Sequence, residues 1–147
     1  MINVLKRGVL FMNVTKILVP IDGTERSMHS LEFIKKLYKP EDIEITIMHV
    51  KELVFVDGIS MSDEIKNSES FGRELLKEAE KIMGDYTVNL YFTFGYAGDE
   101  IVKRAKEEED SIIVMTKSTK KGLTRIIGSC TSYVLKHTTS TVMIIPE

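Results

Sequence analysis

The sequence predicts an α/β protein built on one doubly wound, five-stranded parallel sheet with helices on both faces. Two observations carry this prediction. Short apolar runs of strand length alternate with longer segments of helical spacing along the chain. The first run, residues 14–21 (VTKILVPI), is a nearly continuous series of β-branched residues and leucine, which is typical of a strand covered on both faces.

Length, composition and charge restrict the class of protein. The chain has 147 residues, the length of one ordinary domain with a buried core. Hydrophobic residues make up 43% of the chain and charged residues 29%, and no apolar run approaches the ~20 residues that cross a bilayer. The formal net charge is -2 with both signs interspersed, so no basic face favours nucleic acid. We therefore expect neither a membrane nor a nucleic acid as partner.

Cysteine usage and the N-terminal stretch bear on the compartment. The single cysteine, Cys130, cannot form an internal disulfide and lies in no zinc-binding pattern, which favours a reducing, cytoplasmic setting. The first residues contain too short an apolar run for a signal peptide. We interpret residues 1–12 as an N-terminal extension and expect a single domain over residues 13–147.

A turn, a helix and a second strand follow the first strand. Asp22-Gly23 is a turn pair, and Thr24 is a candidate N-cap for an amphipathic helix that ends before Pro40. Residues 43–50 (IEITIMHV) predict the second strand. Strand, helix and strand together imply a right-handed crossover between parallel strands.

The same alternation continues to the end of the chain. After a loop over residues 51–62 we expect a helix over 63–83 that ends at Gly84, a half-buried edge strand over 88–94, a helix over 99–108, a strand over 111–115, a helix that opens at Gly128-Ser129, and a closing strand over 141–145. Ligands of such sheets bind beyond the carboxyl ends of the strands, where the strand order reverses. This rule points to Asp22 and to residues 116–129.

Five segments, in this order, resemble the universal stress protein family over about residues 13–147. They are Ile17-Leu18-Val19-Pro20-Ile21-Asp22-Gly23-Thr24, Met48-His49-Val50, Ile113-Val114-Met115, Gly122-Leu123-Thr124-Arg125-Ile126-Ile127-Gly128-Ser129 and Val142-Met143-Ile144-Ile145-Pro146. The resemblance implies a Rossmann-like fold of the adenine nucleotide α-hydrolase type with strand order 3-2-1-4-5. It also implies a binding protein for ATP or AMP, with Mg²⁺ as a candidate companion.

The resemblance names the residues that would contact the nucleotide. They are Pro20, Ile21, Asp22, Val50, Met115, Thr116, Thr119, Gly128, Ser129 and Cys130. The phosphate loop of the family has the form Gly-x2-Gly-x9-Gly-Ser/Thr, whereas here threonines stand at the first two glycine positions and the spacing to Gly128 is one residue shorter. Threonine resists the positive φ and the close approach to phosphate that glycine permits.

Two interpretations of this altered loop stay open. Lys117, Lys120, Lys121 and Arg125 could hold phosphate without a glycine cradle, or they could be solvated surface charges. On the second interpretation the chain is a family member that binds no nucleotide and acts through protein partners.

Several single residues also have alternative interpretations. Asp22 is expected to form the turn, with or without a ligand contact. Cys130 is either a small buried residue or a thiol whose pKa is lowered at a helix N-terminus. His29, His49 and His137 lie on different predicted elements, which argues against a shared metal site and a catalytic role.

No catalytic signature stands out. The chain lacks a G-x-x-x-x-G-K-[ST] loop, a G-x-G-x-x-G turn after the first strand and a G-x-S-x-G elbow, so a slow nucleotide hydrolase with Asp22 at its centre is only an alternative. The apolar closing strand Val142–Ile145 predicts an exposed sheet edge. Paired with its copy, as the resemblance implies, it would form a homodimer; alternatively, residues 1–13 shield it.

Overall fold

The main sheet of the protein has five parallel strands. The computed structural model describes residues 2–4, 10–12, 14–53, 57–58, 60–109, 111–117 and 127–146. The strands are β3 (Thr15–Pro20), β4 (Ile43–Lys51), β5 (Thr87–Phe94), β6 (Ile112–Thr116) and β7 (Val142–Ile145), in the order β5-β4-β3-β6-β7. When these five strands are numbered in chain order, with β3 as the first, their order across the sheet is 3-2-1-4-5. The predicted fold class and strand order are therefore confirmed.

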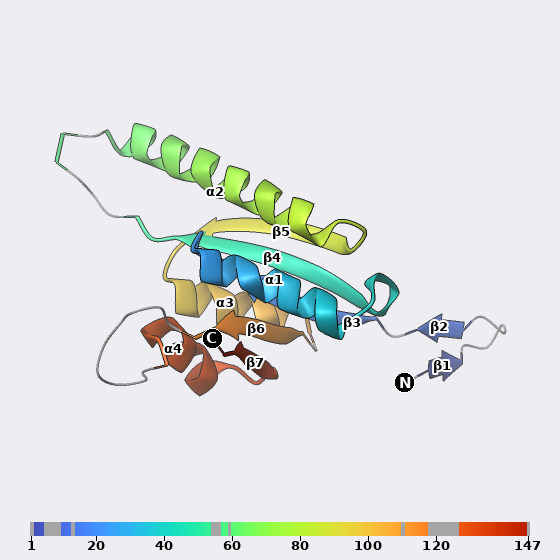
Figure 1. The fold of residues 1–147 in the computed structure, drawn as a ribbon. Helices are drawn as coiled ribbons and strands as arrows, with labels where there is room; N and C mark the ends of the chain where they lie inside the picture. Colours follow the sequence, from blue (N-terminus) through green and yellow to red (C-terminus); the bar gives the residue numbers. More distant parts are fainter. Residues whose placement is uncertain are drawn as a thin grey trace.

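Among the described residues, four helices cover the two faces of this sheet (Figure 1). They are α1 (Glu25–Leu37), α2 (Met61–Met83), α3 (Ala97–Glu107) and α4 (Ser129–His137), with a short 3-10 turn η1 (Pro40–Asp42) after α1. Buried residues of α1 and α2 share one apolar cluster, and those of α3 and α4 share another. None of the helices in the described ranges combines the length and the apolar character that crossing a bilayer requires.

The central strand separates two cores. In β3, Ile17 and Val19 pack into the cluster beneath α1 and α2, whereas Leu18 packs into the cluster beneath α3 and α4. All three side chains are fully buried. Because successive side chains of a strand point to opposite faces, a strand with both faces buried needs an unbroken apolar run, as the sequence showed.

Helix ends follow the predicted signals within two residues. α2 begins at Met61 because the Ser60 hydroxyl accepts a hydrogen bond from the Asp63 N–H (3.2 Å). It ends at Gly84, whose φ of 59° lies in the left-handed region that glycine adopts freely. On the edge strand β5, Leu90 shares a face with Val88 and Phe92, which pack against the core, yet it is 38% exposed.

The first residues form a separate small sheet. β1 (Ile2–Val4) and β2 (Leu10–Met12) pair antiparallel and do not join the main sheet. Figure 1 shows them beyond the amino-terminal end of β3, opposite to the carboxyl ends of the strands. These two strands therefore do not pair with β7, and within the described parts of the chain the edge of β7 carries no further strand.

Candidate functional site

A cavity of about 340 Å³ opens at the carboxyl ends of β3, β4 and β6. β3 lies between β4 and β6 in the sheet, so the chain order reverses at this point and the loops diverge to opposite faces. The cavity is lined by Pro20, Ile21, Asp22, Thr24, Ser27, Val50, Ala97, Ile101, Met115, Thr116, Lys117, Gly128, Ser129, Cys130 and Thr131. Residues from six elements and their connections thus surround one space.

The cavity brings together the residues that the sequence singled out. Pro20, Ile21, Asp22, Val50, Met115, Thr116, Gly128, Ser129 and Cys130 all line it. Thr119 lies outside the described residues, as do Lys120, Lys121 and Arg125. Thr116 is the last residue of β6, so its branched side chain occupies the wall of the cavity where a glycine would leave space.

Asp22 is held by the helix that follows it. Its Oδ1 accepts hydrogen bonds from the Thr24 N–H (2.9 Å) and from the Thr24 hydroxyl (2.6 Å). The same Thr24 is the N-cap of α1, where its hydroxyl oxygen accepts from the Ser27 N–H at 3.2 Å. Gly23 between them has a φ of 85°. Asp22 therefore forms the predicted turn, and the cap of α1 belongs to Thr24.

Hydrogen bonding keeps the Asp22 carboxylate charged. Partial burial alone would raise its pKa, but hydrogen bonds from Thr24 and Ser27 outweigh that effect and lower the pKa below its ordinary value of 3.8. A carboxylate has two oxygens with several acceptor positions. Thr24 uses Oδ1, and a carboxylate bonded in this way retains further acceptor positions.

The start of α4 supplies backbone donors to the cavity. Its N-cap is Gly128, which has no side chain to accept from the first turn, and Ser129, Cys130 and Thr131 of that turn line the cavity. N–H groups at a helix N-terminus carry a partial positive charge that attracts anions. Lys117 adds a formal positive charge to the lining, and its carbonyl accepts a hydrogen bond from Arg26 Nη1 (3.0 Å).

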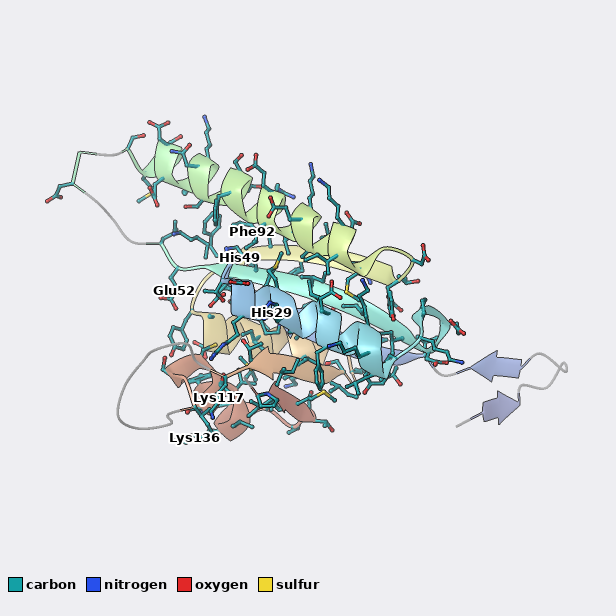
Figure 2. All side chains as sticks on the ribbon, in the orientation of Figure 1. His29, His49, Glu52, Phe92, Lys117 and Lys136 are labelled. Carbon is teal, nitrogen blue, oxygen red and sulfur yellow. The ribbon has the colours of Figure 1, made fainter. Side chains whose placement is uncertain are left out.

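Acidic groups flank the Cys130 thiol. Burial raises its pKa, and the Glu52 and Asp22 carboxylates raise it further. The interpretation of Cys130 as a thiol with a lowered pKa is therefore wrong, because burial and two nearby carboxylates raise that pKa. Glu52 follows β4, and Figure 2 shows it at the same end of the sheet as Lys117.

The three histidines occupy three unconnected places. His29 lies near Glu25 (3.7 Å) on α1, and His137 stacks on Tyr133 of α4. His49 is buried in β4, and its Nδ1 lies 2.8 Å from the Ile21 carbonyl oxygen. Across the described ranges of the chain, no three His, Cys, Asp or Glu side chains converge in a way that could hold a metal ion.

Five residues of the lining were not predicted from the sequence as site residues, namely Thr24, Ser27, Ala97, Ile101 and Thr131, whereas Lys117 was among the loop cations considered for phosphate. The glycines before and in α3 were the available signal for Ala97. A Cβ on Gly98 would lie 2.6 Å from Cδ1 of Tyr133, so α3 approaches α4 more closely than a side chain would allow. This close packing brings the start of α3 to the cavity.

The fold and the cavity define a class: a doubly wound α/β protein with a binding cavity at the switch point of its sheet. Comparison with known proteins gives the family. The pattern of the universal stress protein family matches residues 13–146, and the chain belongs to this family.

Curated relatives and solved structures agree with this assignment. The chain is 27% identical to universal stress protein MJ0531 of Methanocaldococcus jannaschii, over 90% of this chain and 82% of that protein. It is 28% identical to universal stress protein YxiE of Bacillus subtilis, over 88% of this chain and 97% of that protein. The solved structure of the protein MJ0577 superposes with a TM-score of 0.73 at 26% identity, covering 93% of this chain and 98% of that one.

More distant structures share the fold. A universal stress protein family protein from Arabidopsis thaliana, solved with AMP bound, superposes with a TM-score of 0.65 at 18% identity, over 90% of this chain and 92% of that one. At this identity the likeness shows the architecture alone.

Proposed function

We propose that this protein is a homodimeric cytoplasmic regulatory protein that binds an adenine nucleotide, ATP or AMP, in the cavity at the carboxyl ends of β3, β4 and β6. One observation carries the proposal: the residues to which family resemblance assigns nucleotide contacts line one cavity of about 340 Å³, with the exception of Thr119 outside the described residues. A cavity of this size lies within the range of small-molecule sites, about 300–1,000 Å³.

The chemistry of the lining suits the parts of a nucleotide. Ile21, Val50 and Met115 offer an apolar wall for a planar base. The ionised Asp22 carboxylate can accept hydrogen bonds from ribose hydroxyls at its remaining acceptor positions. The uncapped first turn of α4, together with Lys117, can receive a phosphate group.

The side chain of Thr116 favours a competing function, in which the protein acts through protein partners and binds no nucleotide. Its β-branched side chain stands in the wall of the cavity at a position where the family pattern has glycine, and this reduces the room for a phosphate chain. If phosphate is excluded, the chain is a family member that binds no nucleotide and acts through protein partners. AMP, with one phosphate, requires less of this space than ATP.

The nucleotide is a regulatory ligand in this proposal and not a substrate. Phosphoryl transfer needs a positioned base or metal beside the transferred group. Asp22 is already bonded to Thr24, and Glu52 sits beside the start of α3, where its Oε1 lies 3.5 Å from the Ala97 nitrogen. Bound Mg²⁺ would then be held mainly by the phosphates and by water.

Native mass spectrometry of the purified protein, followed by thermal-shift titration with ATP, ADP and AMP with and without Mg²⁺, tests the proposal. A working site predicts a co-purified nucleotide, or a melting temperature that rises with ligand concentration by linkage. The Asp22→Ala variant should lose this response because its ribose acceptor is gone.

The matched control is Asp63→Ala. Asp63 also binds the N-cap of a helix, since its Oδ2 accepts from the Ser60 hydroxyl (2.7 Å) at the start of α2, but it does not line the cavity. Its ligand response should equal that of the unmodified protein. If no bound mass is found and the melting temperature does not shift up to about millimolar ligand, the partner-binding function becomes the conclusion. A Kd of about 1 mM corresponds to a binding free energy of about -4 kcal/mol. Nucleotide turnover that Asp22→Ala abolishes would instead support a slow hydrolase.

A further inference from the structure

We propose that His49 is a positioning residue for the cavity: its Nδ1–H holds the Ile21 carbonyl and thereby sets the turn that presents Asp22 to a ligand. The inference rests on the proposed function for the ligand, but the geometry that carries it is independent of any ligand. Figure 2 shows His49 beside Phe92 in the layer between the sheet and α2.

Both backbone polar groups of Ile21, its N–H and its carbonyl, form hydrogen bonds with residues of β4. Its N–H donates to the Met48 carbonyl (2.8 Å), and its carbonyl oxygen lies 2.8 Å from Nδ1 of His49. Ile21 comes directly after the last residue of β3, so its N–H bond to Met48 lies one residue beyond the last register pair, Pro20 with Met48. The His49 side chain therefore adds one more hydrogen bond between β4 and this segment, at the carbonyl of the residue before Asp22.

The partner identifies the form of the imidazole ring. A carbonyl oxygen can only accept a hydrogen bond, so Nδ1 carries the proton and donates. His49 is 6% exposed and Ile21 is 4% exposed. If the donor were removed, a buried carbonyl would lose its partner, and the chain would have to shift or admit water to satisfy it.

Packing from α2 keeps the ring in this orientation. Gly72 lies so close that a Cβ there would come 2.3 Å from Cε2 of Phe92 and 3.0 Å from Cδ2 of His49. The rings of His49 and Phe92 have centroids 6.0 Å apart. The imidazole thus has a fixed plane between Phe92 and α2, and its Nδ1 points to the site side.

The position of the Ile21 carbonyl affects a ligand through the turn at Asp22-Gly23. Asp22 follows Ile21 directly, and its carboxylate is oriented by Thr24, which in turn caps α1. A shift of the Ile21 carbonyl would move the whole turn relative to Val50 across the cavity. Misplacement of a binding group by a fraction of an ångström is enough to weaken ligand binding.

Four variants separate positioning from packing. His49→Asn places an amide donor near the place of Nδ1, His49→Gln places one near Nε2, and His49→Leu has none. Isothermal titration with AMP should show that Kd rises about tenfold in His49→Leu and His49→Gln, because roughly one hydrogen bond is lost. In His49→Asn, Kd should stay within about threefold of that of the unmodified protein. Ile45→Val, which loosens the same apolar core on β4 at a residue outside the cavity lining, should lower the melting temperature and leave Kd unchanged.

Equal losses of affinity in His49→Asn, His49→Gln and Ile45→Val would overturn the proposal, because they would trace the effect to general loosening. So would an unchanged Kd in His49→Gln. The contrast between the asparagine and glutamine variants decides the matter even if His49→Leu does not fold.

A ligand-free measurement distinguishes failure of this inference from failure of the proposed function. Amide hydrogen exchange by NMR reports the Thr24 N–H, which donates to Asp22 Oδ1. Its exchange should quicken in His49→Gln and stay at the original rate in His49→Asn. If AMP does not bind the unmodified protein but this pattern holds, positioning is correct and the nucleotide function is wrong. If Thr24 exchange is the same in all variants, His49 does not position the turn.

Discussion

The Asp22 carboxylate both forms the turn after β3 and lines the cavity in which we propose that a nucleotide binds. Its turn, its bonds to Thr24 and its place in the cavity wall come from the same few atoms. Because these bonds favour the charged form, its pKa lies below the ordinary 3.8.

A pH prediction follows at this scale. A carboxyl group with a lowered folded pKa stabilises the folded state above its ordinary pKa, and this contribution is lost as the pH falls through the folded value. The difference in unfolding free energy between the unmodified protein and Asp22→Asn should therefore be constant from about pH 7 to about pH 5 and should shrink below about pH 4. Urea unfolding at each pH measures it, and a difference that stayed constant down to about pH 2 would contradict the assignment.

Helix α1 depends on its N-cap at the element scale. Replacement of Thr24 by alanine removes the acceptor for the Ser27 N–H and the hydroxyl donor to Asp22. We expect Thr24→Ala to lower the unfolding free energy by about 1 kcal/mol. Thr24→Ser retains the hydroxyl and should stay close to the unmodified protein; a loss as large as that of alanine would mean that the methyl group, not the cap, is responsible. Denaturant midpoints compare the three.

Helix α2 lies unusually close to the sheet at Gly72. Alanine there would gain about 1 kcal/mol in helix propensity, but its Cβ would meet the Phe92 ring at 2.3 Å. Since overpacking costs about 1–3 kcal/mol, we expect Gly72→Ala to destabilise the protein on balance.

A double-mutant cycle tests this clash. In the Phe92→Leu background the ring is absent, so Gly72→Ala should cost less than it does alone, and the two changes should couple by more than about 0.5 kcal/mol. Additive effects would place the cost of Gly72→Ala elsewhere than at Phe92. Thermal or urea melts of the four proteins complete the cycle.

At the scale of the whole molecule, no strand in the described part of the chain pairs with the side of β7 that faces away from β6. The carbonyls of Thr141 and Ile145 accept from Ile113 (2.9 Å) and Lys117 (3.3 Å), on the β6 side. Because groups alternate along a strand, Val142 and Ile144 direct their N–H and C=O outward. This edge is the surface through which we propose that two copies pair.

The position of the proline determines the expected outcome of a substitution in β7. Ile144→Pro removes an outward N–H and should produce a folded monomer, whereas Met143→Pro removes an inward one and should weaken pairing with β6. Sedimentation or light scattering gives the mass, and circular dichroism reports the fold. A dimer that persists in folded Ile144→Pro would exclude pairing through β7.

Much of the architecture could be predicted from the sequence. The nearly continuous run of β-branched residues and leucine over residues 14–21 predicted a central strand, because a strand buried on both faces cannot alternate regularly with polar residues, and the structure buries Ile17, Leu18 and Val19 completely. Turn and cap residues such as Thr24 and Gly84 located the helix ends, since their chemistry is local. The strand order came from resemblance to a family.

The sequence by itself determined the class of fold and the end of the sheet where a ligand would bind, because periodicity, turns and caps act over a few residues and the switch-point rule needs only the order of elements. Tertiary structure alone decided what surrounds that site. It brought Ala97 beside Glu52 across 45 positions of sequence, buried the Cys130 thiol near two carboxylates, and directed His49 to the Ile21 carbonyl across 28 positions. These contacts depend on how helices and strands pack in three dimensions, and no local pattern of residues encodes them.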